Sequence, residues 1–324
     1  MKHLLILLIS ITVLSCQLDS LTDYTPKGNR YALVIGVSYE GLSLVIDTES
    51  REIPLELNAT KKDATEIGKA LKQYGYTVTE LVSSETYPLT KDKIIGDLEV
   101  WSLSGDDQVV VFFAGHGEIV RGTHYLLMER DTYSNSFNTW EDWYDDVEEH
   151  DFSSRELLDE LASLGVPAVL LLDACVSGGF IPGDPHSHDR LGIWWDEKEE
   201  YPKAESIRRS LNTFFFFPEK TYEPEHIWVM SAAGSDEDAR EGIAFDEEGG
   251  GGDHGAFTYM LLQGLSISNG YASGDANRDG VLLLSELYAD VIQSFQKHAQ
   301  TFGSRMYYPR LSGSPRDIIL GKTK

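Results

Sequence analysis

The sequence predicts an α/β fold in which a mainly parallel central sheet is covered by helices on both faces. Several continuous apolar runs are typical of strands that are buried on both sides. Amphipathic segments alternate with these runs, which favours parallel strands joined by crossover helices. The chain shows no internal repeat, and we therefore expect one domain over residues 30–320 of the 324.

The strands are predicted from apolar runs that are bounded by turn-forming residues. Such runs stand at intervals along the first three quarters of the chain, and each is long enough to cross a sheet. In chain order, the predicted strands are residues 31–37, 77–82, 109–113, 169–172 and 227–230.

The helices between these strands are predicted from apolar residues at three- and four-residue spacing. The first helix begins at Thr60 and ends at Gly75, because glycine commonly follows the last turn of a helix. The second spans residues 91–103. The third spans residues 153–164 and begins with a capping box at Ser153.

Two stretches show little periodicity and are predicted to be irregular. Residues 131–151 are acidic and aromatic. Residues 180–225 form a longer insert that contains Pro, His, Trp and a run of Phe. Loops of this length are often functional.

The N-terminus is predicted to be an export signal over residues 1–15, because a short basic start precedes an apolar run too short to span a bilayer. The run ends in Val-Leu-Ser-Cys, which is similar to a bacterial lipoprotein box. That similarity implies a lipid on Cys16 and a tether over residues 16–29. Gln17 is not the Asp associated with inner-membrane retention, so an outer-membrane anchor in the cell envelope is expected by analogy. The alternative is an ordinary signal peptide with an incidental cysteine.

The strongly acidic net charge limits the kinds of molecule that the protein is expected to bind. The formal net charge of −26, from 27 basic and 53 acidic residues, repels nucleic acid and anionic membrane surfaces. It attracts cationic ligands such as peptides rich in Lys or Arg. The alternative is that the acidic surface only improves solubility.

The two cysteines, Cys16 and Cys175, allow no disulfide if the first carries lipid. Cys175 would then be a free thiol outside the cytoplasm, where thiols tend to oxidise. A catalytic role explains such a thiol, and a buried inert cysteine is the alternative.

A histidine and this cysteine each follow a predicted buried strand, in the segments Ala-Gly-His116-Gly and Asp-Ala-Cys175-Val-Ser-Gly-Gly. In open α/β sheets, ligands bind at the carboxyl ends of the strands, so we expect both residues at one edge. Cys175 would act as nucleophile in acyl transfer and His116 as general base. The N–H groups of Gly117 and Cys175 are the candidates for an oxyanion hole. No third, orienting residue is evident.

Several short sequence blocks, each different from the others, follow one another along the chain. They lie at residues 31–36, 62–64, 114–117, 173–179, 231–233, 237–241 and 254–258. Together they resemble the caspase–metacaspase family of cysteine peptidases, over residues 28–315. The separation of 59 positions from His116 to Cys175 is of the family's order, about 50 in caspases. The resemblance implies a caspase-like three-layer α/β/α sandwich and a cysteine endopeptidase that needs no cofactor for catalysis.

The resemblance also implies a substrate preference. Asp63 and Asp173 match the acids with which metacaspases bind Arg or Lys before the cleaved bond, so peptides with basic residues are the expected substrates. Ala114 departs from the Ser of many metacaspases. Two local alternatives remain: Asp63 fits a capping box with Thr60, and Asp173 could cap the following turn.

The segment Asp275–Glu286 fits the calcium-loop pattern without a mismatch. Calcium prefers oxygen ligands, and this pattern supplies them at defined positions, with Gly280 at the sharp turn. The expected ligands are Asp275, Asn277, Asp279, the carbonyl of Val281 and Glu286, with a helix following over residues 284–298. The alternative is a turn that keeps this shape without metal.

The remaining histidines lack the spacing of zinc ligands and are predicted to be surface residues. For the whole chain, the alternative to a peptidase is a catalytically silent, caspase-like envelope lipoprotein that binds peptides or partners.

Overall fold

The computed structural model describes residues 24–83, 88–130, 136–181, 226–235, 237–243, 251–298, 308–313 and 317–323. The predicted export signal, the lipid-bearing Cys16 and nearly all of the insert at 180–225 lie outside these residues. The candidate active-site residues and the calcium loop of the predicted domain lie within them.

Six strands form the central sheet, in the order β15-β11-β10-β5-β1-β4. The strands from β11 to β4 run parallel, and β15 pairs antiparallel with β11 at one edge. The prediction of a mainly parallel sheet is therefore confirmed, and each predicted strand is present. Their bounds are Arg30–Gly36 for β1, Thr77–Val82 for β4, Gln108–Ala114 for β5, Ala168–Asp173 for β10, Ile227–Ser231 for β11 and Arg310–Ser312 for β15.

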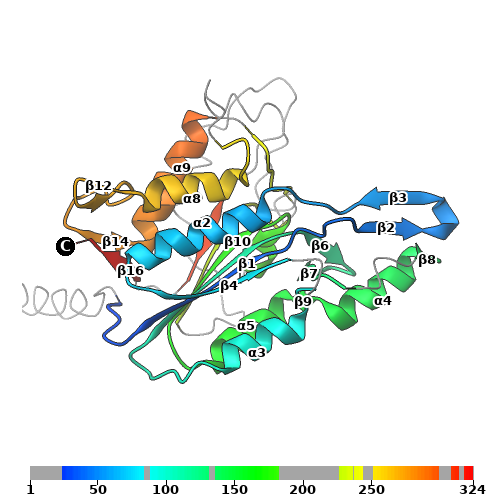
Figure 1. Ribbon diagram of the computed structural model, residues 1–324, viewed down its shortest axis with the longest axis horizontal. Helices are drawn as coiled ribbons and strands as arrows, with labels where there is room; N and C mark the ends of the chain where they lie inside the picture. The colour runs from blue at the N-terminus through cyan, green and yellow to red at the C-terminus, as the bar shows by residue number, and fades with distance from the viewer. Residues whose placement is uncertain are drawn as a thin grey trace, which may run out of the picture.

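Helices cover both faces of this sheet (Figure 1). One face packs against α2 (Thr60–Gln73), α8 (Ala256–Leu265) and α9 (Leu284–Lys297). The opposite face packs against α3 (Lys91–Glu99) and α5 (Ser154–Ser163). The predicted three-layer sandwich is thus confirmed.

Strand β1 shows why the predicted strands are continuously apolar. Successive side chains of a strand point to opposite faces, and here both faces are covered. Ala32 and Val34 pack on the side of α2, α8 and α9, whereas Leu33 and Ile35 pack on the side of α3 and α5. All four are buried, so no position in the strand favours a polar residue.

One predicted irregular stretch is wrong, because residues 131–151 contain the helix α4 (Trp140–His150). Thr139 caps it, accepting a hydrogen bond from the Asp142 N–H while the Asp142 carboxylate accepts from the Thr139 N–H. Trp143 and Val147, four residues apart, are its buried face. The acidic residues on the solvent-facing side dominate the composition of this stretch, so the spacing of its few apolar residues did not predict a helix.

Shorter elements surround the sandwich. Strand β2 pairs with both β3 and β8 in a small three-stranded sheet. Strands β6, β7 and β9 form a second small sheet. The remaining bounds are β2 Ser43–Ile46, a 3-10 turn at Asp47–Glu49, β3 Arg51–Pro54, β6 Gly117–Val120, β7 Thr123–Leu126, β8 Ser136–Phe137, β9 Phe152–Ser153, a 3-10 turn at Ser177–Phe180, β12 Ile267–Ser268, β13 Tyr271–Ala272, β14 Val281–Leu283 and β16 Ile319–Lys322.

The ends of the domain differ slightly from the prediction. Tyr24 pairs with Ile318 and Gly28 donates to the Asp106 carbonyl, so residues 24–29 of the predicted tether belong to the folded body. At the other end, β16 extends the domain beyond residue 320. No helix within the described part of the chain is long and apolar enough to cross a membrane.

Candidate active site

The register of two neighbouring strands places the predicted pair. Ala114 at the end of β5 lies opposite Asp173 at the end of β10. His116 and Cys175 each follow two residues later, so both reach the same edge of the sheet. They line one cavity of about 230 Å³ together with both predicted acids; its lining residues are Leu57, Thr60, Asp63, Ala114, Gly115, His116, Asp173, Ala174, Cys175, Ala239, Arg240, Glu241 and Gly255.

His116 is oriented by a backbone oxygen. Its Nε2 lies 2.7 Å from the carbonyl oxygen of Leu55, just after β3. A carbonyl only accepts hydrogen bonds, so Nε2 carries the proton and Nδ1 is left with a lone pair. The Leu55 carbonyl is the orienting group that sequence reasoning missed, because a main-chain atom leaves no motif.

Tyr39 contacts the same histidine through both its ring and its hydroxyl group. Its ring lies 4.7 Å from the imidazole, centroid to centroid, and its hydroxyl accepts from the His116 N–H at 3.1 Å. That hydroxyl donates to the Leu127 carbonyl at 2.6 Å. Burial lowers the pKa of His116, so the imidazole is neutral at pH 7 and able to accept a proton.

Cys175 is half-buried, and its Sγ lies 3.7 Å from the Ala239 carbonyl, to which the thiol donates. Burial, with the charge of Asp238, raises the pKa of this thiol to about 11. At neutral pH the cysteine is therefore a thiol, and it needs a base to become a nucleophile.

The glycines near His116 and Cys175 allow different close contacts of the backbone. A Cβ at Gly117 would lie 2.0 Å from the carbonyl oxygen of Cys175, so this glycine lets the two loops touch. A Cβ at Gly178 would lie 2.5 Å from the backbone of Gly234, and one at Gly179 would strike the ring of His124. Gly178 and Gly179 thus serve packing behind the nucleophile.

Asp63 points toward α8 rather than capping its own helix. Its two oxygens contact the His254 Nδ1 at 2.7 Å and the Gly255 N–H at 2.9 Å. The first helical turn of α2 has no side-chain cap, so the capping-box alternative is wrong. Burial raises the pKa of Asp63. His254 is itself buried, and the prediction that it lies on the surface is wrong; buried His124 corrects the same prediction.

Asp173 is also held by α8. One of its oxygens accepts from the Thr258 N–H at 3.0 Å and from the Thr258 hydroxyl at 2.6 Å, so it does not cap the turn that follows it. Burial and the charge of Asp63 raise the pKa of Asp173 to about 7. A Cβ at Gly255 would lie 2.1 Å from Asp173 and 3.2 Å from Asp63, so only glycine fits between the two acids.

Glu241 is a third acid of the cavity, and sequence reasoning did not assign it a role. It accepts from the N–H groups of Asn58 and Ala59, at 3.1 and 3.0 Å, and so caps α2 from a distant segment. Its segment also supplies the Ala239 carbonyl to Cys175 and the Glu237 carbonyl to the Val176 N–H. Residues 237–241 therefore form one wall of the cavity.

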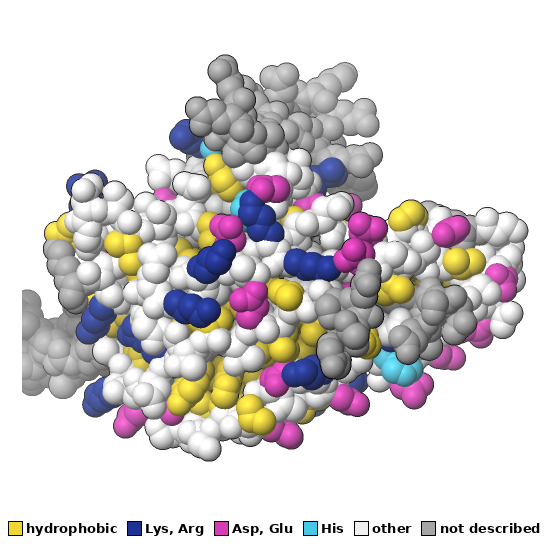
Figure 2. Space-filling view, viewed as in Figure 1, with side chains coloured by type: hydrophobic (Ala, Val, Ile, Leu, Met, Phe, Trp, Pro, Cys, Tyr) yellow, Lys and Arg dark blue, Asp and Glu magenta, His cyan; other side chains and the backbone are white. Residues whose placement is uncertain are grey.

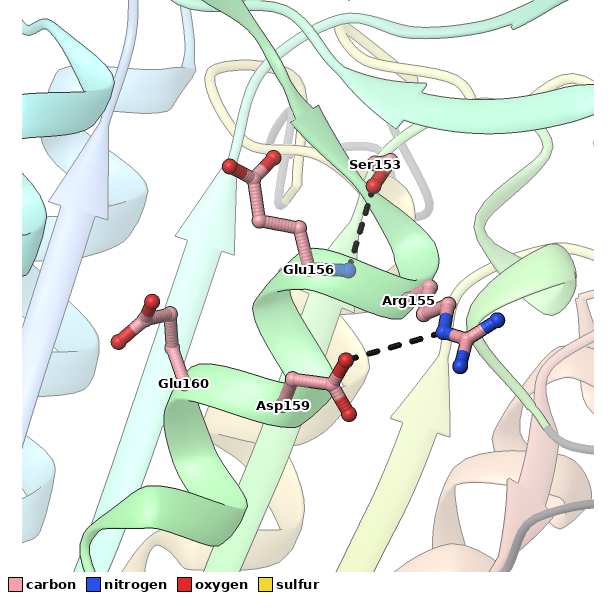
Figure 3. A pocket seen from close by; sticks show the side chains of 5 residues that line it. All are labelled: Ser153, Arg155, Glu156, Asp159 and Glu160. Atoms are coloured by element: carbon pink, nitrogen blue, oxygen red, sulfur yellow. Dashed lines mark hydrogen bonds and ion pairs between the residues drawn. The ribbon is translucent and has the colours of Figure 1, made fainter.

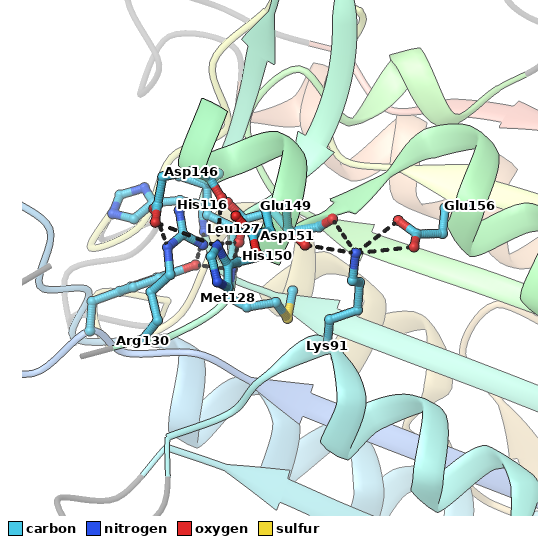
Figure 4. A network of polar contacts seen from close by, with 11 residues as sticks. Lys91, His116, Leu127, Met128, Arg130, Asp146, Glu149, His150, Asp151 and Glu156 are labelled. Carbon is cyan, nitrogen blue, oxygen red and sulfur yellow. Dashed lines mark hydrogen bonds and ion pairs between the residues drawn. The ribbon is translucent and has the colours of Figure 1, made fainter. Parts of the chain in front are cut away.

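A buried polar network lies behind His116 (Figure 4). The Leu127 N–H donates to the His116 carbonyl, and the Met128 N–H donates to Asp151. Arg130 pairs with Asp151 and with Asp146 on α4. The segment that contacts His116 is thus tied to α4 and β9 by charge-assisted hydrogen bonds.

A second hollow lies on α5 alone (Figure 3). Ser153 caps the helix at the Glu156 N–H, and Arg155 lies 3.8 Å from Asp159. All of its lining side chains belong to one exposed helix start, so it offers no convergent chemistry. Its lining residues are Ser153, Arg155, Glu156, Asp159 and Glu160.

The predicted calcium ligands lie near the C-terminal end of α8, whereas the acids of the cavity contact its N-terminal end; they belong to the turn before β14, the first residue of β14 and the first turn of α9. Across the segments that the structure describes, no three His, Cys, Asp or Glu side chains gather closely enough to hold a metal ion. The loop residues are nevertheless folded around their own backbone N–H groups.

Known proteins similar to this chain were found among solved structures. Among solved structures, a protein from Geobacter sulfurreducens is similar at 15% identity and a TM-score of 0.49, covering 89% of this chain and 95% of that one. Caspase-1 from Spodoptera frugiperda is similar at 13% identity and a TM-score of 0.46, covering 93% and 92%. No curated protein sequence matches the chain.

The family model of the caspase domain matches residues 29–272, about three quarters of the chain. This stretch contains five of the six strands of the central sheet, all except β15, together with both strand-end loops and both acids. The caspase-like fold and the resemblance found in the sequence are therefore confirmed, and the chain belongs to the caspase domain family of peptidases.

Proposed function

We propose that this protein is a cysteine endopeptidase in which Cys175 is the nucleophile and His116 the general base, and that it cuts after Arg or Lys. The observation that carries the proposal is the single cavity that holds the thiol, the neutral imidazole and two buried carboxyl groups. Perturbed titratable groups that converge in one cavity are typical of active sites.

The protonation states support a general-base mechanism. The Cys175 thiol gives its proton to Nδ1 of His116, and the sulfur attacks the carbonyl carbon of the substrate. The Leu55 carbonyl then stabilises the imidazolium through Nε2. His116 returns the proton to the leaving amine, the acyl group stays on sulfur, and water releases it in a second cycle.

The developing oxyanion needs N–H donors, for which we propose Gly117 and Cys175. The support for this pair is their contact: the absent side chain of Gly117 leaves its backbone against the Cys175 carbonyl. Any side chain at Gly117 would push the nucleophile loop away from the histidine loop.

The preference for a basic residue rests on Asp63 and Asp173. Both carboxyl groups are buried beside the nucleophile, and burial raises the pKa values of both. A guanidinium or ammonium group entering the cavity would be attracted by both and by Glu241, and would lower these pKa values.

The test is peptide hydrolysis by the protein without its lipid signal, using matched substrates with Arg, Lys, Asp or Gln before the scissile bond. We expect cleavage after Arg and Lys, loss of at least ~10³-fold in kcat/KM for Cys175→Ala, and a similar loss for His116→Ala. The distant variant His298→Ala serves as the control and should keep full activity. Cleavage after Asp would leave the mechanism standing and refute the role of the two acids.

One observation favours the alternative of a silent binding module: the thiol is engaged with Ala239 and its pKa is high. Such a module would bind Arg-containing peptides without cleaving them. Calorimetry with an uncleaved Arg peptide, together with the absence of any product, would identify it.

We also propose that Cys16 anchors the protein to the bacterial cell envelope, favouring the outer membrane. The support is the lipobox-like sequence before Cys16. Metabolic labelling with a fatty acid should mark the wild-type chain and spare Cys16→Ser, which should leave the membrane fraction. Equal labelling of both chains would refute the anchor.

A further inference from the structure

We propose that the loop Asp275–Glu286 binds one calcium ion, and that this ion links the turn before β14 to the first turn of α9. The loop lies outside residues 29–272, which match the caspase domain, so it is a feature of this chain's C-terminal part. The inference does not depend on the peptidase activity.

The loop is already folded as a calcium loop requires. Asp275 accepts from the Gly280 N–H at 2.9 Å, across the loop. Asn277 accepts from the Asp279 N–H at 2.8 Å, and Asp279 accepts from the Val281 N–H at 2.7 Å. Each of these side chains therefore turns back toward the loop's own backbone; Asp275 is buried, whereas Asn277 and Asp279 remain open to solvent.

The Asp275 carboxylate is an independent indication that the loop binds a cation. Its side chain is only 3% exposed, and its second oxygen, Oδ1, is buried without a hydrogen-bond partner. Because Oδ2 reaches the Gly280 N–H on the far side of the loop, this carboxylate faces the loop interior. A buried carboxylate oxygen without a partner is costly, and a bound cation removes that cost.

Calcium suits the donors better than other metals. The set is all oxygen: three carboxylates, one amide oxygen and the carbonyl of Val281, with water completing the shell. It contains no histidine or cysteine, which zinc prefers. Magnesium demands a smaller, near-octahedral shell and gives up its waters reluctantly, so it should bind more weakly.

Glu286 has to move for the shell to close. In this structure its carboxylate accepts from the Leu283 N–H at 3.2 Å and caps the first turn of α9. This explains why no three carboxylates are gathered within the described loop. Rotation of the Glu286 side chain toward Asp275 would exchange one backbone hydrogen bond for two bonds to the ion.

The ion would stabilise the elements that hold the acids of the cavity. The Gly274 N–H donates to the Gly264 carbonyl of α8 at 2.8 Å, and a Cβ at Gly264 would touch Leu287 of α9. The other end of α8 holds Asp173 through Thr258. Calcium in the loop is therefore linked to the cavity through α8.

The experiment uses the Cys175→Ala protein, so that proteolysis plays no part. We would titrate calcium chloride by calorimetry and follow thermal unfolding with 10 mM calcium, 10 mM magnesium or EDTA. A dissociation constant of about 10⁻⁴–10⁻³ M is expected, with an increase of about 3–10 °C in Tm over EDTA. Magnesium should give a smaller increase.

Variants separate the site from general ion effects. Glu286→Gln keeps an acceptor for the Leu283 N–H, and Asp275→Asn keeps one for the Gly280 N–H, so both should fold and lose the calcium-dependent shift. Asp290→Asn, one turn further along α9, is the matched control and should keep it. Absence of calcium heat in the parent, or an equal shift in Glu286→Gln and parent, would overturn the proposal.

Discussion

Cys175 and His116 are both uncharged at pH 7 in the free protein, because burial raises the pKa of the thiol to about 11 and lowers that of the imidazole. The pair is thus not a preformed thiolate–imidazolium ion pair. In the proposed mechanism, proton transfer from the thiol therefore accompanies attack on the bound peptide.

The first prediction concerns alkylation of Cys175 in the free protein. Because only the thiolate reacts, the rate with iodoacetamide should rise about tenfold per pH unit from pH 7 to 10. Asp238→Asn should react faster at each pH, since the charge of Asp238 raises the thiol pKa. A profile that levels off near pH 8.5, the ordinary value for cysteine, would contradict this.

The second prediction concerns Asp173, whose pKa of about 7 places its ionisation in the physiological range. At pH 6 about nine tenths of this group is protonated, and at pH 8 about nine tenths is ionised. The ionised form attracts a basic residue, so KM for an Arg substrate should fall up to about tenfold between these pH values.

Asp173→Asn should raise KM and abolish this pH dependence, whereas Asp92→Asn, an exposed acid on α3, should change neither. A KM that rises with pH in the wild type would show that the carboxyl group does not contact the basic residue.

At this scale, sequence reasoning found the side chains with chemical motifs and missed their supports. His116, Cys175, Asp63 and Asp173 all lie at one cavity. The first two were expected there from their strand ends, and the two acids from the family resemblance. The Leu55 carbonyl could not be predicted, because every residue has one. The roles of His254 and Thr258 depend on α8 crossing above both acids, which requires knowledge of the packing.

Between elements, one close approach near the site is that of β1 to the start of α2. A Cβ at Gly36 would lie 2.4 Å from the Thr60 carbonyl oxygen, which is backbone and cannot move aside alone. The strand and helix are thus in direct main-chain contact, and α2 brings Asp63 into the cavity.

The third prediction follows from this contact. Gly36→Ala should lower the free energy of unfolding by ~1–3 kcal/mol through overpacking. Gly96→Ala is the matched control, because Gly96 lies inside α3 with open space around it, and alanine is a better helix former. It should raise stability by up to ~1 kcal/mol. Urea unfolding measures both, and equal signs for the two would refute the packing argument.

Elements with a clear period were predicted, and those without one were not. Helix α8 is apolar almost all round, with seven of its ten residues buried, so it lacks the polar face that marks a surface helix. Strand β15 has only three residues, Arg-Leu-Ser, and is antiparallel at the sheet edge. Its existence depends on the free edge of β11 rather than on its own sequence.

For the whole molecule, the acidic excess of 53 over 27 basic residues is the dominant surface property. Figure 2 shows that basic side chains are dispersed among the acidic ones on the viewed face, so the excess does not form one continuous patch there. Self-repulsion at this net charge nevertheless opposes the compact state.

The fourth prediction is that salt stabilises the protein. Raising sodium chloride from 10 mM to 0.5 M shortens the Debye length from about 30 Å to below 8 Å and screens this repulsion. Tm should increase, and choline chloride should act equally, since screening does not depend on the cation. A decrease in Tm would indicate that exposed ion pairs, such as those of Arg121 with α4, outweigh the repulsion.

The wall of the cavity at residues 237–241 and the glycine at 255 stand late in the chain, far behind the histidine and cysteine that they enclose. During synthesis the reactive pair leaves the ribosome first, on β5 and β10, without Ala239 to hold the thiol or α8 to hold the acids. A growing chain therefore exposes the thiol and the imidazole before the walls of their cavity are complete. Under the proposed function, a substrate could be bound and cut only when almost the entire domain has been made and folded.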